Sequence, residues 1–174
     1  MIKNSTNKVK FGNMKIKWSL NIMILVILAS SCTVIGPARF WAYFHKELIE
    51  KHESDQGPWG GHRNICWKSN GKKIFETIEV LNYAKRNGWE LTDSLLLSSI
   101  SLNYDSNKND DYMYDLIRET VLQEWKLKDV NILYIFKTGW VSVEPGNSRE
   151  TEKNGFVGIS NDKKALFVYH VWGE

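Results

Sequence analysis

An uncharged segment near the amino terminus sets the first limit on what this chain can fold into. Residues 18–36 carry no charge, and they contain an apolar run at 22–28 that follows Lys15 and Lys17. A basic start, an apolar centre and small residues at the end are typical of a secretory signal, which is removed from the mature protein. The folded body is therefore expected from the roughly 140 residues that follow, enough for one domain with a sizeable core.

The signal-like segment ends at a cysteine, because residues 29–31 read Ala-Ser-Ser and lead directly into Cys32. Together with the regions before them, these residues resemble the signal peptide of a bacterial lipoprotein precursor. That family usually has leucine three residues before the cysteine, whereas this chain has Ala29 there and Leu28 one residue earlier. The resemblance implies cleavage after residue 31, a lipid on the Cys32 thiol, and attachment to a membrane of the cell envelope. The absence of an acidic pattern after Cys32 favours the periplasmic face of an outer membrane.

Two other interpretations of the same segment remain open. Residues 18–36 approach the roughly 20 that a membrane-spanning helix needs, so the segment is alternatively an uncleaved anchor. It is otherwise an ordinary cleaved signal that leaves a soluble product. Met14 is a plausible true start. The expected organisation is a signal peptide at 1–31, a short tether at 32–37 and one domain at 38–174.

Charge and cysteine content narrow the classes of partner. The whole chain has a formal net charge of +3, but five lysines are its only charged residues before Cys32, so the mature net charge is −2. Nucleic-acid binding is not expected, because it needs a clustered positive face. If Cys32 carries lipid, Cys66 is left without a disulfide partner; if Cys32 is free, a Cys32–Cys66 bridge is the alternative.

Apolar residues at helical spacing predict three helices, over about 38–51, from 72 to about 86, and over about 110–125. These residues are Phe40, Trp41, Phe44, Leu48 and Ile49 in the first segment, Ile74, Phe75, Ile78, Leu81 and Ala84 in the second, and Met113, Leu116, Ile117, Val121 and Trp125 in the third. Asn87-Gly88 is expected to end the second helix, with Trp89 folding back on its last turn.

Strands are expected mainly late in the chain. The expected strands are 64–68, 95–102, 131–136, 140–143, 156–160 and 165–172, with a polar loop at 105–111. Helices early and strands late predict a small α+β domain with about three helices packed on a mainly antiparallel sheet.

A second resemblance covers residues 72–103. Residues 88–91 read Gly-Trp-Glu-Leu and end the second expected helix, which is similar to a motif of small bacterial domains of unknown function. The resemblance implies a helix that leads directly into a strand, and a late Tyr169-His170 pair that closes the sheet. It implies no chemistry.

One loop is the best candidate for recognition. Trp59 stands in Gly-Pro-Trp-Gly-Gly, and His62 and Arg63 follow it. A large aromatic residue between glycines has no evident core role, and aromatic residues often dominate binding. We therefore expect a binding site at 58–63 formed by Trp59, His62 and Arg63; the alternative is that Trp59 packs the loop onto the body.

No catalytic or metal motif is recognised. His52, His62 and Cys66 could offer zinc ligands, but their spacing fits no standard pattern, so neither a metal nor a cofactor is expected. His170 could act as a base oriented by Glu174, although a packed histidine is the more common role. The expected function is a non-catalytic module that binds another envelope protein or a glycan. The alternatives are an immunity protein against a toxin, or an envelope enzyme on cell-wall or sugar substrates with His170 or His62 as base.

Overall fold

The computed structural model describes residues 36–71, 73–97, 112–125, 130–146 and 148–173. The described residues from Pro37 onward belong to one compact unit. The expected signal segment and Cys32 therefore lie outside the described residues. Among the helices of the described part, none is both long enough and apolar enough to cross a bilayer.

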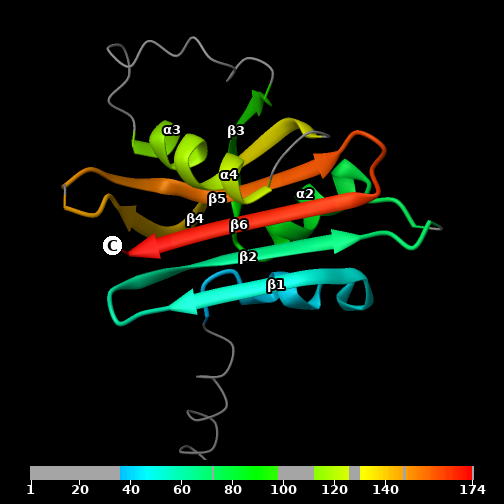
Figure 1. The fold of residues 1–174 in the computed structure, drawn as a ribbon, viewed down its shortest axis with the longest axis horizontal. Coiled ribbons are helices and arrows are strands. Elements are labelled where there is room, and N and C mark those ends of the chain that lie inside the picture. Colours follow the sequence, from blue (N-terminus) through cyan, green and yellow to red (C-terminus); the bar gives the residue numbers. More distant parts are fainter. Residues whose placement is uncertain (1–35, 72, 98–111, 126–129, 147, 174) are drawn as a thin grey trace, which may run out of the picture. The chain divides into compact units, whose positions relative to one another are not determined.

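A six-stranded sheet forms the centre of the unit, in the order β1-β2-β6-β5-β4-β3 (Figure 1). Its strands are β1 (Ile49–Gln56), β2 (Gly60–Lys68), β3 (Glu90–Leu96), β4 (Val130–Val143), β5 (Glu150–Ser160) and β6 (Ala165–Gly173). Neighbouring strands run antiparallel, and a short parallel contact joins Ser142 of β4 to Gly173 of β6. The strands predicted at 156–160 and 165–172 are confirmed as parts of β5 and β6, but β6 lies inside the sheet, so Tyr169 and His170 do not close an edge.

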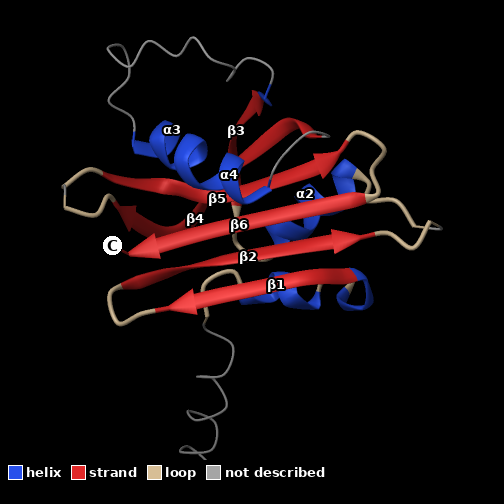
Figure 2. Ribbon diagram, viewed as in Figure 1, coloured by secondary structure: helices blue, strands red, loops and turns tan. Residues whose placement is uncertain are grey.

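Both faces of the sheet are covered, because consecutive side chains of a strand point to opposite faces. One core contains Val157 and Val168, and the other contains their neighbours Phe156 and Tyr169. The first core is covered by the 3₁₀ turns η1 (Arg39–Tyr43) and η2 (Lys46–Leu48) and by helix α2 (Thr77–Arg86). The second is covered by α3 (Tyr112–Leu116), the π-helical turn η4 (Ile117–Val121) and α4 (Leu122–Trp125) (Figure 2).

Tryptophan packing dominates the first core. The Trp41 ring lies 6.1 Å from Trp67 and 5.7 Å from Trp89, measured between ring centroids, and all three side chains are buried. The Trp67 indole N–H donates a 2.7 Å hydrogen bond to the Phe44 carbonyl, which ties η1 to the sheet. Trp172 is also buried, so core packing accounts for four of the chain's tryptophans.

The predicted end of α2 is confirmed. Gly88 has a φ of 87°, the left-handed conformation that glycine adopts most easily. The Trp89 amide donates to the Ala84 carbonyl at 3.1 Å, which closes the last turn. Trp89 folds back as expected, but Ile78 on the predicted apolar face is 67% exposed, and Val80 is buried in its place.

The prediction of about three helices is wrong. Residues 38–51 form two short 3₁₀ turns separated at His45, whose φ is 41°, and the chain then enters β1. Two short helical segments remain, α2 and the continuous α3–η4–α4 run, in which Met113 and Ile117 are buried as predicted. The unit is thus α+β with mostly antiparallel strands and few helical residues. Three predictions fall outside the described residues. They concern the second part of the expected strand (98–102), the expected loop at 105–111 and the Trp125 side chain.

Candidate functional site

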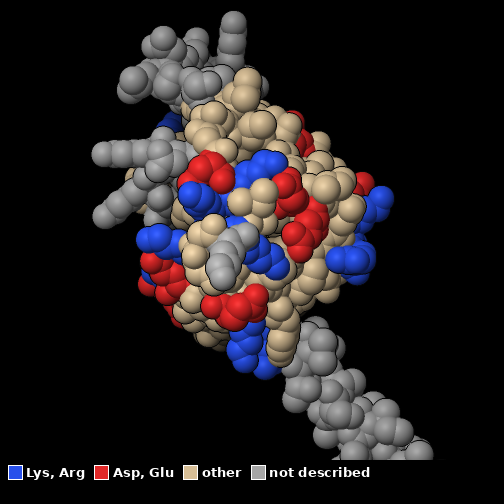
Figure 3. Space-filling model, turned by 90° about the vertical axis from the view of Figure 1, so that its right-hand side faces the viewer, with Lys and Arg blue, Asp and Glu red and all other residues tan. Residues whose placement is uncertain are grey.

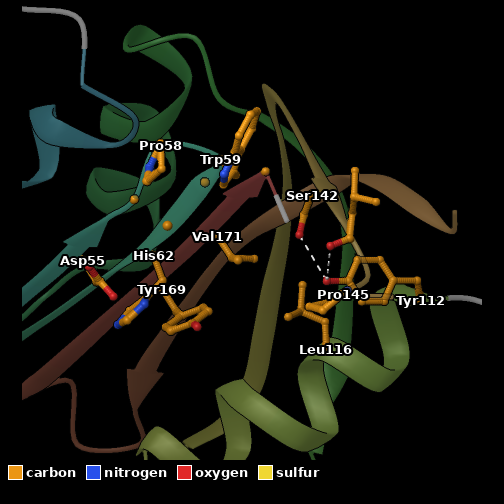
Figure 4. A pocket seen from close by; sticks show the side chains of 15 residues that line it. Asp55, Pro58, Trp59, His62, Tyr112, Leu116, Ser142, Pro145, Tyr169 and Val171 are labelled. Atoms are coloured by element: carbon orange, nitrogen blue, oxygen red, sulfur yellow. Dashed lines mark hydrogen bonds between the residues drawn. The ribbon is translucent and has the colours of Figure 1, made fainter. Parts of the chain in front are cut away.

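A cavity of about 450 Å³ opens at one end of the sheet, where the β1–β2 hairpin, the ends of β4 and β6, and α3 meet (Figure 4). We call it the hairpin pocket. Its lining residues are Asp55, Gly57, Pro58, Trp59, Gly60, Gly61, His62, Tyr112, Leu116, Ser142, Val143, Pro145, Tyr169, Val171 and Gly173. Its volume falls within the range of small-ligand sites, which are concave and mainly apolar with a few polar groups.

Two glycines allow close backbone contacts at the hairpin, Gly61 between β1 and β2 and Gly173 between the hairpin turn and the end of β6. A Cβ atom on Gly61 would collide with the carbonyl oxygen of Asp55, and one on Gly173 would collide with the carbonyl oxygen of Trp59. The hairpin itself is closed by a 2.7 Å hydrogen bond from the Gly57 amide to the Gly60 carbonyl. The backbone of the Trp59 turn thus rests directly on the end of β6, which fixes the position of the pocket wall.

Trp59 stands at the rim of the pocket, and 80% of its surface is exposed. This is the largest exposed fraction among the exposed large apolar residues of the described chain. The ring belongs to neither core, so it does not serve to pack the loop onto the body. The sequence reasoning anticipated a loop tryptophan without a core role, and the structure places it beside a cavity.

One end of the pocket is aromatic and carries a carboxylate (Figure 4). Asp55 of β1 pairs with His62 of β2, and the His62 ring stacks on Tyr169 of β6 with centroids 5.9 Å apart and planes 17° apart. His62 is half-buried, whereas Asp55 is exposed. No ion pair of Asp55 with another described residue is found.

The other end is fixed by a buried hydroxyl pair. The Tyr112 hydroxyl lies 3.2 Å from Ser142 Oγ and donates to the Val143 carbonyl at 3.4 Å. These bonds attach the start of α3 to the end of β4. Sequence reasoning missed Tyr112, Ser142 and Tyr169 as site residues, because they are far apart along the chain and only the fold brings them together.

Arg63, the third residue of the expected site, does not line the pocket. Successive β2 residues alternate between faces, so Arg63 lies on the opposite face from His62. Its side chain is buried; Nη2 donates to Ser54 Oγ at 3.2 Å, while Nε and Nη1 have no hydrogen-bond partner. Burial, followed by the charge of Arg39, lowers the pKa of the Arg63 guanidinium. The expected trio is therefore divided between two faces.

His170 is placed as a core residue. Its side chain is buried and its Nε2 lies 3.0 Å from Thr138 Oγ1. Since the Thr138 hydroxyl donates to Asn154 Oδ1 at 2.7 Å, it accepts from His170 Nε2–H. Burial, with a smaller contribution from the Arg63 charge, lowers the pKa of His170 to about 3. His170 does not line the pocket, and the Glu174 side chain expected to orient it lies outside the described residues.

The remaining histidines and the cysteine lie apart from the hairpin pocket. His45 accepts from Lys73 Nζ at Nδ1 (2.6 Å) and donates from Nε2 to Glu79 (2.9 Å). Cys66 is paired in the sheet with Lys51 of β1 and Phe167 of β6, and its thiol lies 3.8 Å from Asn64 Oδ1. Within the described residues no three His, Cys, Asp or Glu side chains are grouped as a metal would need.

Charged side chains at the far end of the sheet are mixed in sign. Figure 3 shows basic and acidic side chains interspersed on that side. Lys163 and Glu76 form a 2.6 Å ion pair there, and Lys68 lies 3.6 Å from Glu50. Surface pairs of this kind contribute little to stability. Because the charges at this end are mixed in sign, the hairpin pocket is the better-defined candidate site.

Comparisons with known proteins give no relative. No family model matches the chain, and neither the curated proteins nor the solved structures contain a match. The candidate site therefore has to be interpreted from its own geometry.

Proposed function

We propose that this chain is a lipid-anchored protein of the cell envelope that binds another macromolecule through the hairpin pocket, without catalysis. The observation that carries the proposal is Trp59, whose ring is 80% exposed beside a cavity of about 450 Å³. Tryptophan is among the residues most often responsible for binding energy at interfaces. An exposed tryptophan on a hairpin whose backbone is held in place has its contact surface already organised for a partner.

The envelope location rests on the sequence of the signal-like segment. Residues 29–31 lead into Cys32 after a basic and an apolar region, as in lipoprotein precursors. Two or more acyl chains hold a protein on a membrane durably. Because the compact unit begins at Pro37, only a short tether separates Cys32 from it, and the binding surface would remain close to the membrane.

The proposal of a non-catalytic role follows from where the candidate bases lie. A general base must reach the proton that it removes, and the His170 side chain is fully buried, with its ring centroid 5.4 Å from that of Trp89. With its pKa lowered to about 3, it is also a weak base. His62 is in the pocket, but its ring stacks on Tyr169 and is not bonded to an orienting carboxylate of the described residues.

The test compares two exposed aromatic residues. Affinity-tagged full-length protein is purified from solubilised envelopes as wild type, Trp59→Ala and Tyr43→Ala, and co-purifying proteins and glycans are quantified. Tyr43 is 66% exposed on η1 and does not line the pocket. We expect one co-purifying species to be lost with Trp59→Ala and kept with Tyr43→Ala, at unchanged melting temperatures. A partner profile that Trp59→Ala leaves intact would contradict the proposal.

A further inference from the structure

We infer that the hairpin pocket receives a basic side chain of a partner protein, a lysine ammonium or an arginine guanidinium. The inference rests on the proposed binding role and adds the chemistry of the group that is bound. Three properties of the pocket carry it: the sign of its charge, the faces of its rings, and the apolar wall between them.

Among the described residues, the pocket lining contains one acidic side chain and no lysine or arginine. Asp55 is that carboxylate, and it is exposed and without an ion-pair partner among the described residues. Arg149, on the connection between β4 and β5, does not offset its charge, because Arg149 already binds Glu144 at 2.6 Å and Asp115 at 3.2 Å. The described lining therefore presents a negative charge, which favours a cation and disfavours an anion.

The rings strengthen the same preference. An aromatic ring is negative on its face, so a cation within about 6 Å of the ring centroid is attracted to it. The His62 ring stacks on the buried Tyr169 ring, and the 80% exposed Trp59 ring at the rim offers an aromatic face to a cation (Figure 4). The Tyr112 ring is held by its bonds to Ser142 and Val143, whose oxygen atoms mark the opposite end of the pocket.

The wall between these polar ends is apolar. Pro58, Leu116 and Val171 line it. Lysine and arginine have long aliphatic stems that pack along apolar surface while the charged end reaches a polar group. A small free amine would leave this wall and the exposed Trp59 ring uncovered. A basic side chain carried on a polypeptide covers both, so we assign the cation to a partner protein.

The direct test is an NMR titration of the folded protein with N-acetyl-arginine amide and with the uncharged N-acetyl-glutamine amide. We expect the arginine compound to shift the amide signals of Gly61 and Gly173 and the indole N–H of Trp59. The glutamine compound should bind more weakly by up to about fivefold, the most that an exposed, partly screened ion pair contributes. Equal binding of the two compounds would overturn the inference.

A matched pair of variants measures the contribution of the Asp55 carboxylate to binding. Asp55→Asn should remove the difference between the two compounds, whereas Glu53→Gln, on the same strand and outside the pocket lining, should preserve it. Both residues are exposed, so both variants are expected to fold, which the spectra report directly. If Asp55→Asn leaves the preference for arginine unchanged, the inference is wrong. If the partner is lost with Trp59→Ala but kept with Asp55→Asn, the pocket binds but does not select a cation.

Discussion

The buried histidine makes the stability of the fold depend on pH in a calculable way. The His170 side chain is buried, and its pKa falls from an unfolded value of 6.5 to about 3. Between these values the unfolded chain binds a proton that the folded chain does not, so the free energy of unfolding decreases as pH falls below 6.5. At pH 5 the difference of about 1.5 pKa units corresponds to about 2 kcal/mol, and at pH 7 the effect is close to zero.

Urea unfolding followed by tryptophan fluorescence at pH 7 and pH 5 measures this quantity. His170 should account for about 2 kcal/mol of the stability that the wild type loses over that interval. His170→Gln retains an N–H for Thr138 and does not titrate, so its loss over the same interval should be smaller by that amount. If wild type and His170→Gln show the same pH dependence, the account of His170 as a neutral core residue is refuted.

Three further predictions concern a buried charge, a core glycine and the membrane anchor. Arg63→Met should raise the free energy of unfolding by about 1 kcal/mol in denaturant titrations, because two buried guanidinium nitrogens without hydrogen-bond partners are removed; a loss of stability would show that Arg63 holds the fold together. Gly155→Ala should cost about 1–3 kcal/mol, because its Cβ would lie 2.5 Å from Thr138 Cγ2 and 2.8 Å from the Trp89 ring. Gly57→Ala, whose Cβ would meet only the Gly60 carbonyl at 3.5 Å, is the control and should be neutral. Growth with labelled palmitate should label the wild type and not Cys32→Ser, and an unlabelled wild type would contradict the lipid anchor.

Helices and strands that are marked by residues adjacent in the sequence were predicted correctly. The helix that ends at Asn87-Gly88 was recognised because its cap is encoded by adjacent residues, and strands β5 and β6 were recognised from short local runs of apolar residues. The buried face of the α3–η4–α4 segment was recognised for the same reason, since Met113 and Ile117 follow helical spacing.

The first segment was misassigned because two different structures share its pattern. Phe40, Trp41 and Phe44 are spaced as on a helix, but the single 3₁₀ turn η1 and the residue that caps its end already place them in one core, and the left-handed residue His45 then separates η1 from η2. Strand β1 was missed because it is an edge strand whose residues 50–56 are all exposed. Charged edge strands of this kind lack the alternation of apolar and polar residues on which strand prediction depends.

The site was predictable only in part. Trp59 and His62 were expected from a local sequence in which a large ring lies between glycines. Their grouping with Arg63 was wrong in one respect, because the strand begins at Gly60 rather than near residue 64, and alternation then sends Arg63 to the other face. Tyr112, Ser142 and Tyr169 join the pocket through strand pairing and helix packing, which no local pattern reports.

Site-specific photo-crosslinking in intact cells tests the central claim most directly. A photoreactive phenylalanine analogue is introduced at position 59 or at position 43 of the full-length protein, and adducts are identified after irradiation. Binding through the hairpin pocket predicts one dominant adduct from position 59 that is absent from position 43. The same partner crosslinking equally from both positions, or from position 43 alone, would contradict the assignment of the pocket as the binding site.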